Sequence, residues 1–270
     1  MQKLIIKGKR KLSGIIKISG SKNATLPILA AAILSKHTKL TNAPFVKDIF
    51  TMLDLLKFIG LKVLIDKKNK VIEIINKKET INTLAPYQLV KTMRAGVLVL
   101  GSLLTKYKKA KVSLPGGCAI GTRPVDIHLF ALKKLGAKIK IKDGYILAEA
   151  KNGLKGARIR FPTVSVGATE NALLAAFKAK GKTILKNCAI EPEIKDLIIF
   201  LKKLGSTIKL KGRKIIIKQN ETKNSKILHS IIFDRIELGT YMIASALASK
   251  KNLTINKIDP KIIKSEIDVL

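Results

Sequence analysis

The chain has no tryptophan, few aromatic residues of any kind and only two cysteines. Aromatic residues make up 4% of it, which leaves little for stacking on nucleic-acid bases. Cys118 and Cys188 are far apart and form no CxxC motif. They therefore predict neither a disulfide framework nor a zinc site, and they fit the reducing conditions of the cytoplasm. The three histidines are scattered, so we expect no metal site and no cofactor.

Long apolar runs are absent as well. The longest, such as residues 26–34, fall well short of the roughly 20 residues that a membrane-spanning helix needs. Residues 1–9 lack the apolar region of a signal peptide. We therefore expect no membrane partner.

Acidic residues are scarce: 18 Asp and Glu stand against 53 Lys and Arg, a formal net charge of +35. Such a charge usually suggests nucleic acid or an anionic membrane as the partner. Here the lysines are spread along the whole chain, and Lys, Ile and Asn are abundant together, which is typical of a biased coding composition. We expect a small anionic substrate and no nucleic acid. A nucleic-acid-binding protein is the alternative, and its binding would fall steeply with salt.

What the sequence does contain is a repeat of about 70 residues, long enough to be a supersecondary unit. Three segments each predict the end of an amphipathic helix, a glycine C-cap and a strand that alternates apolar residues with lysine. They are Leu56–Val63, Leu132–Ile139 and Leu201–Ile208. Ahead of each lies a helix of small apolar residues, which should be buried because nearly all its sides are apolar. These helices are Ala24–Leu34, Ala95–Leu104 and Ala168–Ala179, and the β-like stretches after them are Lys39–Pro44, Lys111–Pro115 and Thr183–Ile190.

The repeat predicts an α/β fold in which three units form one domain, residues 21–232. A fourth unit begins with a helix over Gly239–Ala248 and a strand over Asn252–Ile258. The sequence ends where its surface helix would follow.

The opening strands, Lys3–Lys7 and Gly14–Ser19, belong to none of the three units. We expect them to pair with the start of the fourth. Residues 1–20 and 233–270 would then form an incomplete second domain.

Residues 114–126, LPGGCAIGTRPVD, are the most distinctive stretch. Gly116-Gly117 can adopt backbone angles closed to other residues, and Arg123 favours the thiolate of Cys118. Pro124 suits the first position of a helix. We therefore expect a reactive cysteine on a loop that leads into an anion-binding helix N-terminus. A glycine-rich turn with an incidental cysteine is the alternative.

Equivalent positions before the three small-residue helices carry groups suited to anions. They are Lys22-Asn23, Arg94 and Ser165-Val166-Gly167. Ser21 is expected to cap its helix. Because equivalent helix ends can converge in a pseudo-symmetric domain, we expect a cationic cleft rich in backbone N–H groups. The alternative is that Arg94 pairs with a nearby carboxylate and Ser165 serves only as a cap.

Two acidic islands interrupt the basic chain, Glu191-Pro192-Glu193 and Phe233–Glu237. They could face a substrate or a lysine-rich partner. We favour a helix cap for the first island and an ion pair for the second.

Six segments resemble, in the same order, the UDP-N-acetylglucosamine 1-carboxyvinyltransferase family of enolpyruvyl transferases. They are SGSKNATLPILAAAIL (19–34), KTMRA (91–95), LPGGCAIGTRPVDIH (114–128), SVGAT (165–169), EPEI (191–194) and DRIELGT (234–240). The resemblance implies an inside-out α/β barrel with two domains of three repeats each, and an active site between the domains that the cysteine loop closes. The sister family of the shikimate pathway shares the fold but lacks the cysteine loop, so Cys118 points away from it.

The resemblance also implies a reaction. The enolpyruvyl group of phosphoenolpyruvate passes to the 3′-hydroxyl of UDP-N-acetylglucosamine and phosphate is released, the first committed step of peptidoglycan synthesis. The implied catalytic residues are Cys118, Lys22 and Arg123, and the implied phosphoenolpyruvate-binding residues are Lys22, Asn23, Cys118 and Arg123. The implied UDP-N-acetylglucosamine contacts are Asn23, Arg94, Arg123, Pro124, Val125, Asp126, Ile127, Thr163, Val164, Ser165, Val166 and Gly167.

Two departures from the family stand out. Thr163 occupies a position where the family often has lysine. Family members are also longer, and their second domain supplies the aspartate proposed as base for the sugar hydroxyl and further arginines. The alternatives to a complete enzyme are therefore a remnant that binds the nucleotide sugar without turnover, and one half of a split enzyme completed by a separate C-terminal half.

Overall fold

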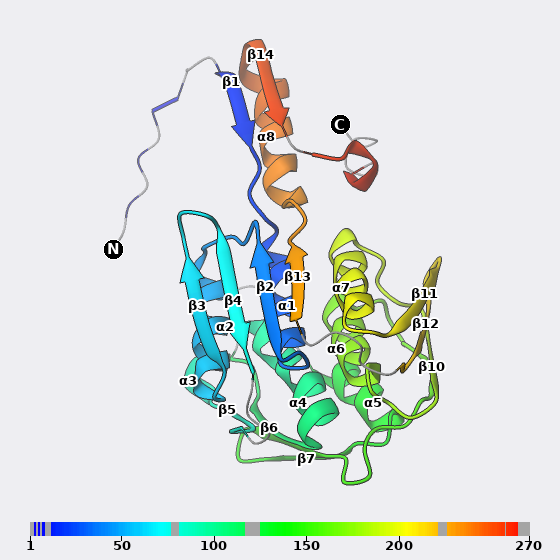
Figure 1. Cartoon of the computed structure of the whole chain (residues 1–270). Coiled ribbons are helices and arrows are strands. Elements are labelled where there is room, and N and C mark those ends of the chain that lie inside the picture. The colour runs from blue at the N-terminus through cyan, green and yellow to red at the C-terminus, as the bar shows by residue number, and fades with distance from the viewer. Residues whose placement is uncertain are drawn as a thin grey trace.

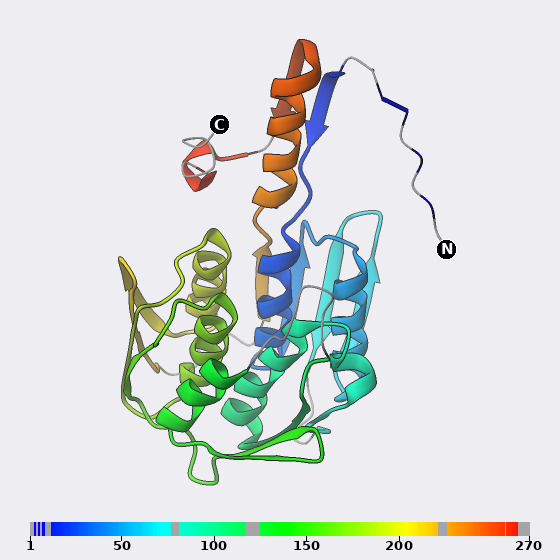
Figure 2. The ribbon, with the colours of Figure 1, turned by 180° about the vertical axis from the view of Figure 1, so that it is seen from behind.

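The computed structural model of the chain describes residues 3, 5, 7–8, 12–76, 81–116, 125–220, 226–256 and 258–263. Its larger part is an α/β body in which small-residue helices lie inside and three four-stranded sheets lie outside (Figure 1). A smaller part, formed by segments near both chain ends, projects from one end of this body (Figure 2). The predicted inside-out α/β architecture is confirmed. None of the described helices has the length and apolarity needed to cross a membrane.

Each unit of the body contributes a central helix, a strand, an outer helix and a β-hairpin, in the predicted order. Unit one consists of α1 (Lys22–Ala32), β2 (His37–Thr41), α2 (Lys47–Phe58), β3 (Lys62–Asp66) and β4 (Val71–Ile75). Unit two consists of the 3₁₀ helix η1 (Arg94–Leu98), α4 (Val99–Tyr107), β6 (Lys109–Ser113), α5 (Asp126–Lys134), β7 (Lys138–Lys142) and β8 (Tyr145–Glu149). Unit three consists of α6 (Val166–Ala176), β10 (Lys182–Lys186), α7 (Pro192–Lys203), β11 (Thr207–Lys211) and β12 (Lys214–Lys218).

The strand that follows each unit pairs with the first strand of the next unit. β5 (Leu84–Ala85), followed by the short helix α3 (Tyr87–Val90), pairs in parallel with β6. β9 (Arg158–Arg160) pairs in parallel with β10. β13 (Lys226–Ser230) leaves unit three and pairs in parallel with β2 of unit one, which closes the three units into a ring. The sheet orders are β13-β2-β4-β3, β5-β6-β8-β7 and β11-β12-β10-β9.

The central helices are buried, as predicted. Every residue from Ala24 to Ala32 of α1 and from Ala168 to Ala176 of α6 is buried. Small side chains let these helices approach closely. At Gly101 of α4 an added Cβ would lie 2.4 Å from Asn171 Oδ1 and 2.6 Å from Asn171 O, so this crossing with α6 requires glycine.

One predicted helix is interrupted. The sequence predicts a continuous helix over residues 95–104, whereas the structure has η1 followed by α4. The side-chain amide of Asn171 donates through Nδ2 to Val97 O (3.2 Å) and accepts through Oδ1 from Gly101 N (2.8 Å). In a continuous α-helix these two backbone groups would bond to each other. The inserted amide replaces that hydrogen bond.

The strands are shifted toward the N-terminus relative to the prediction. β2 ends at Thr41 and β10 at Lys186, before the predicted Pro44 and Ile190. The residues that follow, Asn42 and Asn187, have left-handed φ values of 56° and 58°. Asparagine tolerates this conformation, and it turns the chain out of the sheet.

The smaller part holds the start of the fourth unit. α8 (Arg235–Ala248) leads into β14 (Ser249–Asn256), which pairs in parallel with β1 (Leu12–Lys17). The predicted pairing of an opening strand with the fourth unit is thus confirmed, with β1 two residues earlier than Gly14–Ser19. The other predicted strand, Lys3–Lys7, lies partly outside the described residues, and its described residues form no strand.

α8 begins four residues before the predicted Gly239. Asp234 Oδ1 accepts hydrogen bonds from Ile236 N (2.9 Å) and Glu237 N (3.1 Å), an N-cap that fixes the start of the helix. After β14 comes a short 3₁₀ helix, η2 (Pro260–Ile263).

The smaller part buries little apolar surface. Its core is Ile18, Phe233, Leu238 and Ile263. Leu238 is the buried residue of α8, whereas Ile243 and Leu247 are 49% and 83% exposed. α8 has the composition of a central helix without the surroundings that bury α1 and α6.

Two chain segments connect the two parts and lie side by side. Ser21 N donates to Ile232 O and Asp234 N to Ser19 O, both at 2.8 Å, around a bridge between Gly20 and Phe233.

The two acidic islands meet at this junction. Arg235 Nε lies 3.0 Å from Glu193 Oε1, so the ion pair expected for the second island is confirmed. Glu191 occupies the position before α7, but its side chain makes no capping hydrogen bond. The first island therefore supplies the residue at the N-cap position of α7, but not the capping hydrogen bond that we expected.

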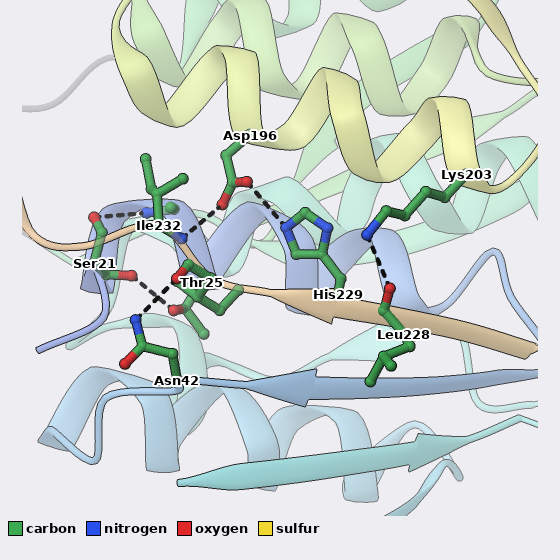
Figure 3. Close-up of polar contacts among 10 residues, drawn as sticks. Ser21, Thr25, Asn42, Asp196, Lys203, Leu228, His229 and Ile232 are labelled. Atoms are coloured by element: carbon green, nitrogen blue, oxygen red, sulfur yellow. Dashed lines mark hydrogen bonds and ion pairs between the residues drawn. The ribbon is translucent and has the colours of Figure 1, made fainter. Parts of the chain in front are cut away.

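β13 and the two residues that follow it are hydrogen-bonded to neighbours on both sides. Asp196 of α7 accepts from His229 Nε2 (3.0 Å) and from Ile232 N (3.3 Å). Asn42 Nδ2 donates to Ile231 O (2.9 Å). Figure 3 shows Asp196 pointing at His229, and Lys203 bonded to Leu228 O at 2.9 Å. The strand that closes the ring is thus tied to α7 as well as to β2.

Candidate functional site

The starts of the three central helices surround one pocket of about 390 Å³. Lys22 and Asn23 come from α1, Arg94 from η1, and Val166 and Gly167 from α6. The convergence predicted from the repeat is therefore confirmed for these five residues. What they bind is a separate question.

The helices from units one and three begin with the same cap. Ser21 Oγ accepts from Ala24 N (3.2 Å), and Ser165 Oγ accepts from Ala168 N (3.3 Å). Both serines therefore cap their helices, as expected. A cap at this position leaves the first N–H groups of α6, those of Val166 and Gly167, available at the pocket. Together with the helix dipole they favour an anion there.

Lys22 is held at the pocket by an acid that the sequence analysis did not single out. Its Nζ lies 3.1 Å from Asp48 Oδ2 of α2, and the two side chains are 41% and 36% exposed. A partly exposed pair of this kind is weak. An incoming anion can compete with Asp48 for the lysine.

Arg94 is exposed and forms no ion pair within the described part of the chain. The alternative that Arg94 pairs with a nearby carboxylate is thus not supported by the described residues. Its charge instead acts on two residues of the same pocket: it adds to the burial that lowers the pKa of His128, and it opposes the burial that raises the pKa of Glu170.

Glu170, on α6, is buried at the pocket. Its burial, followed by the charges of Glu193 and Glu191, raises its pKa well above the ordinary value, against the opposing effect of Arg94. The acid form of this side chain is therefore favoured over the charged form, and the fixed charges around it in the pocket are those of Lys22, its partner Asp48 and Arg94.

Replacing Glu170 with glutamine should stabilise the chain at alkaline pH. Above its ordinary pKa the unfolded chain releases this proton while the folded chain retains it, so rising pH favours unfolding until the folded-state pKa is passed. We expect Glu170→Gln to unfold about 2–4 °C above the wild type at pH 8, a change of about 1 kcal/mol, and level with it at pH 4. Thermal unfolding followed by circular dichroism measures this. Glu149→Gln, at an exposed glutamate, is the control, and a Glu170→Gln difference that does not vary with pH would contradict the assignment.

The other predicted site residues fall into two groups. Cys118, Arg123 and Pro124 lie outside the described residues. Those that are described but do not line the pocket are Val125, Asp126, Ile127, Thr163, Val164 and Ser165. Asp126 begins α5 and is exposed, and Thr163 and Val164 form the exposed approach to α6.

Three titratable residues of the pocket were not assigned to a site by the sequence analysis: Asp48, His128 and Glu170. His128 is the last residue of the LPGGCAIGTRPVDIH segment and Glu170 directly follows SVGAT, so adjacency to these segments was the available signal. Asp48 had none beyond its place in the first turn of α2.

Cys188 is buried, and burial raises the pKa of its thiol to about 11. At neutral pH it therefore holds about 100-fold less thiolate than a thiol of ordinary pKa. We predict that a maleimide reagent labels one thiol of the folded chain quickly and that Cys118→Ala abolishes the fast phase. Equal labelling rates for the two thiols, measured by mass spectrometry, would contradict this.

No three His, Cys, Asp or Glu side chains within the described ranges come together as a site for a metal ion. The chemistry available at the pocket is that of cations, backbone N–H groups and a buried histidine.

Comparison with known proteins places the chain in a family. The family model of EPSP synthase (3-phosphoshikimate 1-carboxyvinyltransferase) matches residues 6–270. The chain is 58% identical to the UDP-N-acetylglucosamine 1-carboxyvinyltransferase of Pelagibacter ubique (strain HTCC1062), over 100% of this chain and 64% of that protein. It is 49% identical to the protein of the same description from Endomicrobium trichonymphae, with the same coverage. The chain thus spans less than two thirds of the length of these relatives.

Solved structures agree on the fold. The enolpyruvyl transferase NikO from Streptomyces tendae superposes with a TM-score of 0.80 at 20% identity, over 97% of this chain and 61% of that one. An EPSP synthase from Acinetobacter baumannii gives a TM-score of 0.71 at 17% identity, over 93% and 56%. The family model, the similar proteins and the fold lead to one conclusion: the chain belongs to the EPSP synthase family of enolpyruvyl transferases.

Proposed function

We propose that this chain carries one side of an active site that transfers the enolpyruvyl group from phosphoenolpyruvate to the 3′-hydroxyl of UDP-N-acetylglucosamine, with release of phosphate. The observation that carries the proposal is the pocket at three equivalent helix starts, which Lys22, Arg94 and the first residues of α6, Val166 and Gly167, line together. The 58% identity to a UDP-N-acetylglucosamine 1-carboxyvinyltransferase supports this choice of substrates. Such a reaction opens peptidoglycan synthesis and would take place in the cytoplasm.

Each of the predicted site residues has a role in the proposed reaction. The sugar 3′-hydroxyl gives up its proton as its oxygen bonds to C2 of phosphoenolpyruvate and C3 gains a proton. The tetrahedral product then loses phosphate from C2 and a proton from C3, which restores the double bond. We assign the proton at C3 to Cys118, and the stabilisation of anionic oxygens to Lys22, Arg123 and Arg94. Asn23 and the segments 123–127 and 163–167 would hold the nucleotide sugar.

We infer that residues 21–232 are the one complete domain, and that residues 1–20 and 233–270 belong to a second. Closure of the ring by β13 supports this division, as do the small separate core and the exposed apolar residues of α8. Two further candidates follow: a chain that binds the nucleotide sugar without turnover, and a split enzyme completed by a separate C-terminal half. The exposed apolar side chains of α8, Ile243 and Leu247, favour a further protein segment that covers this helix.

Phosphate release by the purified chain, with both substrates and with each alone, tests the proposal. Release that requires both substrates and Cys118 would establish transfer, with Cys118→Ala as the control. No release but retained binding of UDP-N-acetylglucosamine would identify a binding half. Failure to bind the nucleotide sugar would overturn the substrate assignment.

A further inference from the structure

His128 is the one histidine of the described chain that lines the pocket. It belongs to α5 and is only 3% exposed. Its ring lies against the start of α6: a Cβ added to Gly167 would be 3.0 Å from His128 Cε1 and 3.3 Å from Nε2. The imidazole edge with Nε2 therefore lies against Gly167, the second residue of α6.

Asn171 determines whether the other ring nitrogen, Nδ1, donates or accepts a hydrogen bond. Asn171 Oδ1 must be the atom that accepts from Gly101 N, because a backbone N–H can only donate. Its Nδ2 then donates one hydrogen to Val97 O and has one left for His128 Nδ1, at 3.2 Å. Nδ1 is thus an acceptor without a proton, and the neutral ring carries its proton on Nε2.

The surroundings keep this ring neutral. Burial and the charge of Arg94 lower the pKa of His128 to about 4, against the smaller opposing effect of Asp126. Within the described residues no acceptor bonds to Nε2. His128 lines the pocket, and its Nε2 is not among the side-chain atoms that are sealed from solvent without a partner. A ligand in the pocket can therefore supply the acceptor that this N–H lacks.

We propose that His128 is a further binding residue of the pocket, donating its Nε2 proton to an anionic oxygen of the bound substrate, and that Asn171 is the positioning residue that fixes its tautomer. The inference rests on the proposed function for the identity of that substrate. Gly167 N–H, Lys22 and Arg94 gather on the same pocket, so the acceptor is a phosphate or carboxylate oxygen. A neutral N–H donor orients the bound oxygen without adding a third positive charge to those of Lys22 and Arg94.

The tautomer is tested first. Nitrogen-15 NMR of the full chain at pH 7 should show His128 with a protonated Nε2 and a bare Nδ1, and His229 is the internal control. Pyrophosphate, phosphoenolpyruvate and UDP-N-acetylglucosamine are added separately. At least one should shift the His128 Nε2–H signal and leave His229 unmoved, and the one that does identifies the source of the oxygen.

Two variants at the same position separate donation from packing. A glutamine amide can occupy the place of Nε2, whereas an asparagine amide reaches only that of Nδ1. By calorimetry with the probe that shifts the signal, we expect His128→Gln to bind within about 3-fold of wild type and His128→Asn about 10-fold more weakly, the loss of one hydrogen bond to an anion.

An Nδ1–H tautomer, a charged ring at pH 7, or a His128 signal that no anion shifts would overturn the inference. So would equal binding by His128→Asn and wild type. A signal that responds to pyrophosphate but not to the nucleotide sugar would leave the inference standing and count against the proposed function. The two are therefore tested separately.

Discussion

Replacing Gly101 with alanine should destabilise the chain by about 2–4 kcal/mol. The new Cβ would lie 2.4 Å from Asn171 Oδ1 and 2.6 Å from Asn171 O, so α4 and α6 must separate or Asn171 must leave its place. Overpacking of this kind costs about 1–3 kcal/mol. Displacing the amide would add the cost of leaving Gly101 N and Val97 O without their buried partner, about 1–3 kcal/mol. Urea unfolding followed by circular dichroism measures the loss.

Gly239→Ala is the matched control. Gly239 lies in α8, and an added Cβ would meet no atom within 4 Å. Alanine has the higher helix propensity, so this variant should match the wild type or exceed its stability by up to about 1 kcal/mol. If Gly101→Ala were also neutral, the close crossing of α4 and α6 would be wrong.

Replacing Asp196 with alanine should cost about 3–5 kcal/mol. Asp196 and His229 are each 2% exposed, with Oδ1 and Nε2 3.0 Å apart, and Ile232 N donates to the other carboxylate oxygen. Removing one partner of a buried polar pair leaves the other without compensation. The loss falls on β13, so the closure of the ring weakens and unfolding should occur at lower urea concentration.

Asp196→Asn tests whether the hydrogen bonds account for this cost. His229 Nδ1 has no hydrogen-bond partner among the described residues, so the ring can move its proton there and accept from the new amide at Nε2. The amide oxygen can keep the bond from Ile232 N. We expect a loss of about 1 kcal/mol. Equal losses for the alanine and asparagine variants would contradict the tautomer exchange.

The repeat was predictable because its signals are local. Glycine caps such as Gly60 and Gly136 have positive φ values of 107° and 94°, and the small-residue helices are recognisable from composition alone. The pairing of β1 with β14 followed from counting units. The break between η1 and α4 was not predictable, because its cause, Asn171, is 70 residues from Gly101.

The residues of the pocket likewise differ in whether the sequence could predict them. Lys22, Asn23, Arg94, Val166 and Gly167 could be found because repeated units place their helix starts together. Asp48 and His128 come from the outer helices α2 and α5, and their approach to the pocket depends on tertiary packing. Glu170 reads as an ordinary helical residue until its burial is known.

Calorimetric binding of UDP-N-acetylglucosamine to wild type, Arg94→Gln and Arg158→Gln tests whether the pocket at the three helix starts binds the nucleotide sugar. Both variants remove one positive charge, but Arg94 lines the pocket whereas Arg158 lies exposed on the outer sheet. We expect wild type and Arg158→Gln to bind alike and Arg94→Gln to bind at least about 10-fold more weakly, as for a lost charge-assisted hydrogen bond. Equal binding by all three proteins, or an equal loss in both variants, would show that the pocket at the three helix starts is not where the nucleotide sugar binds.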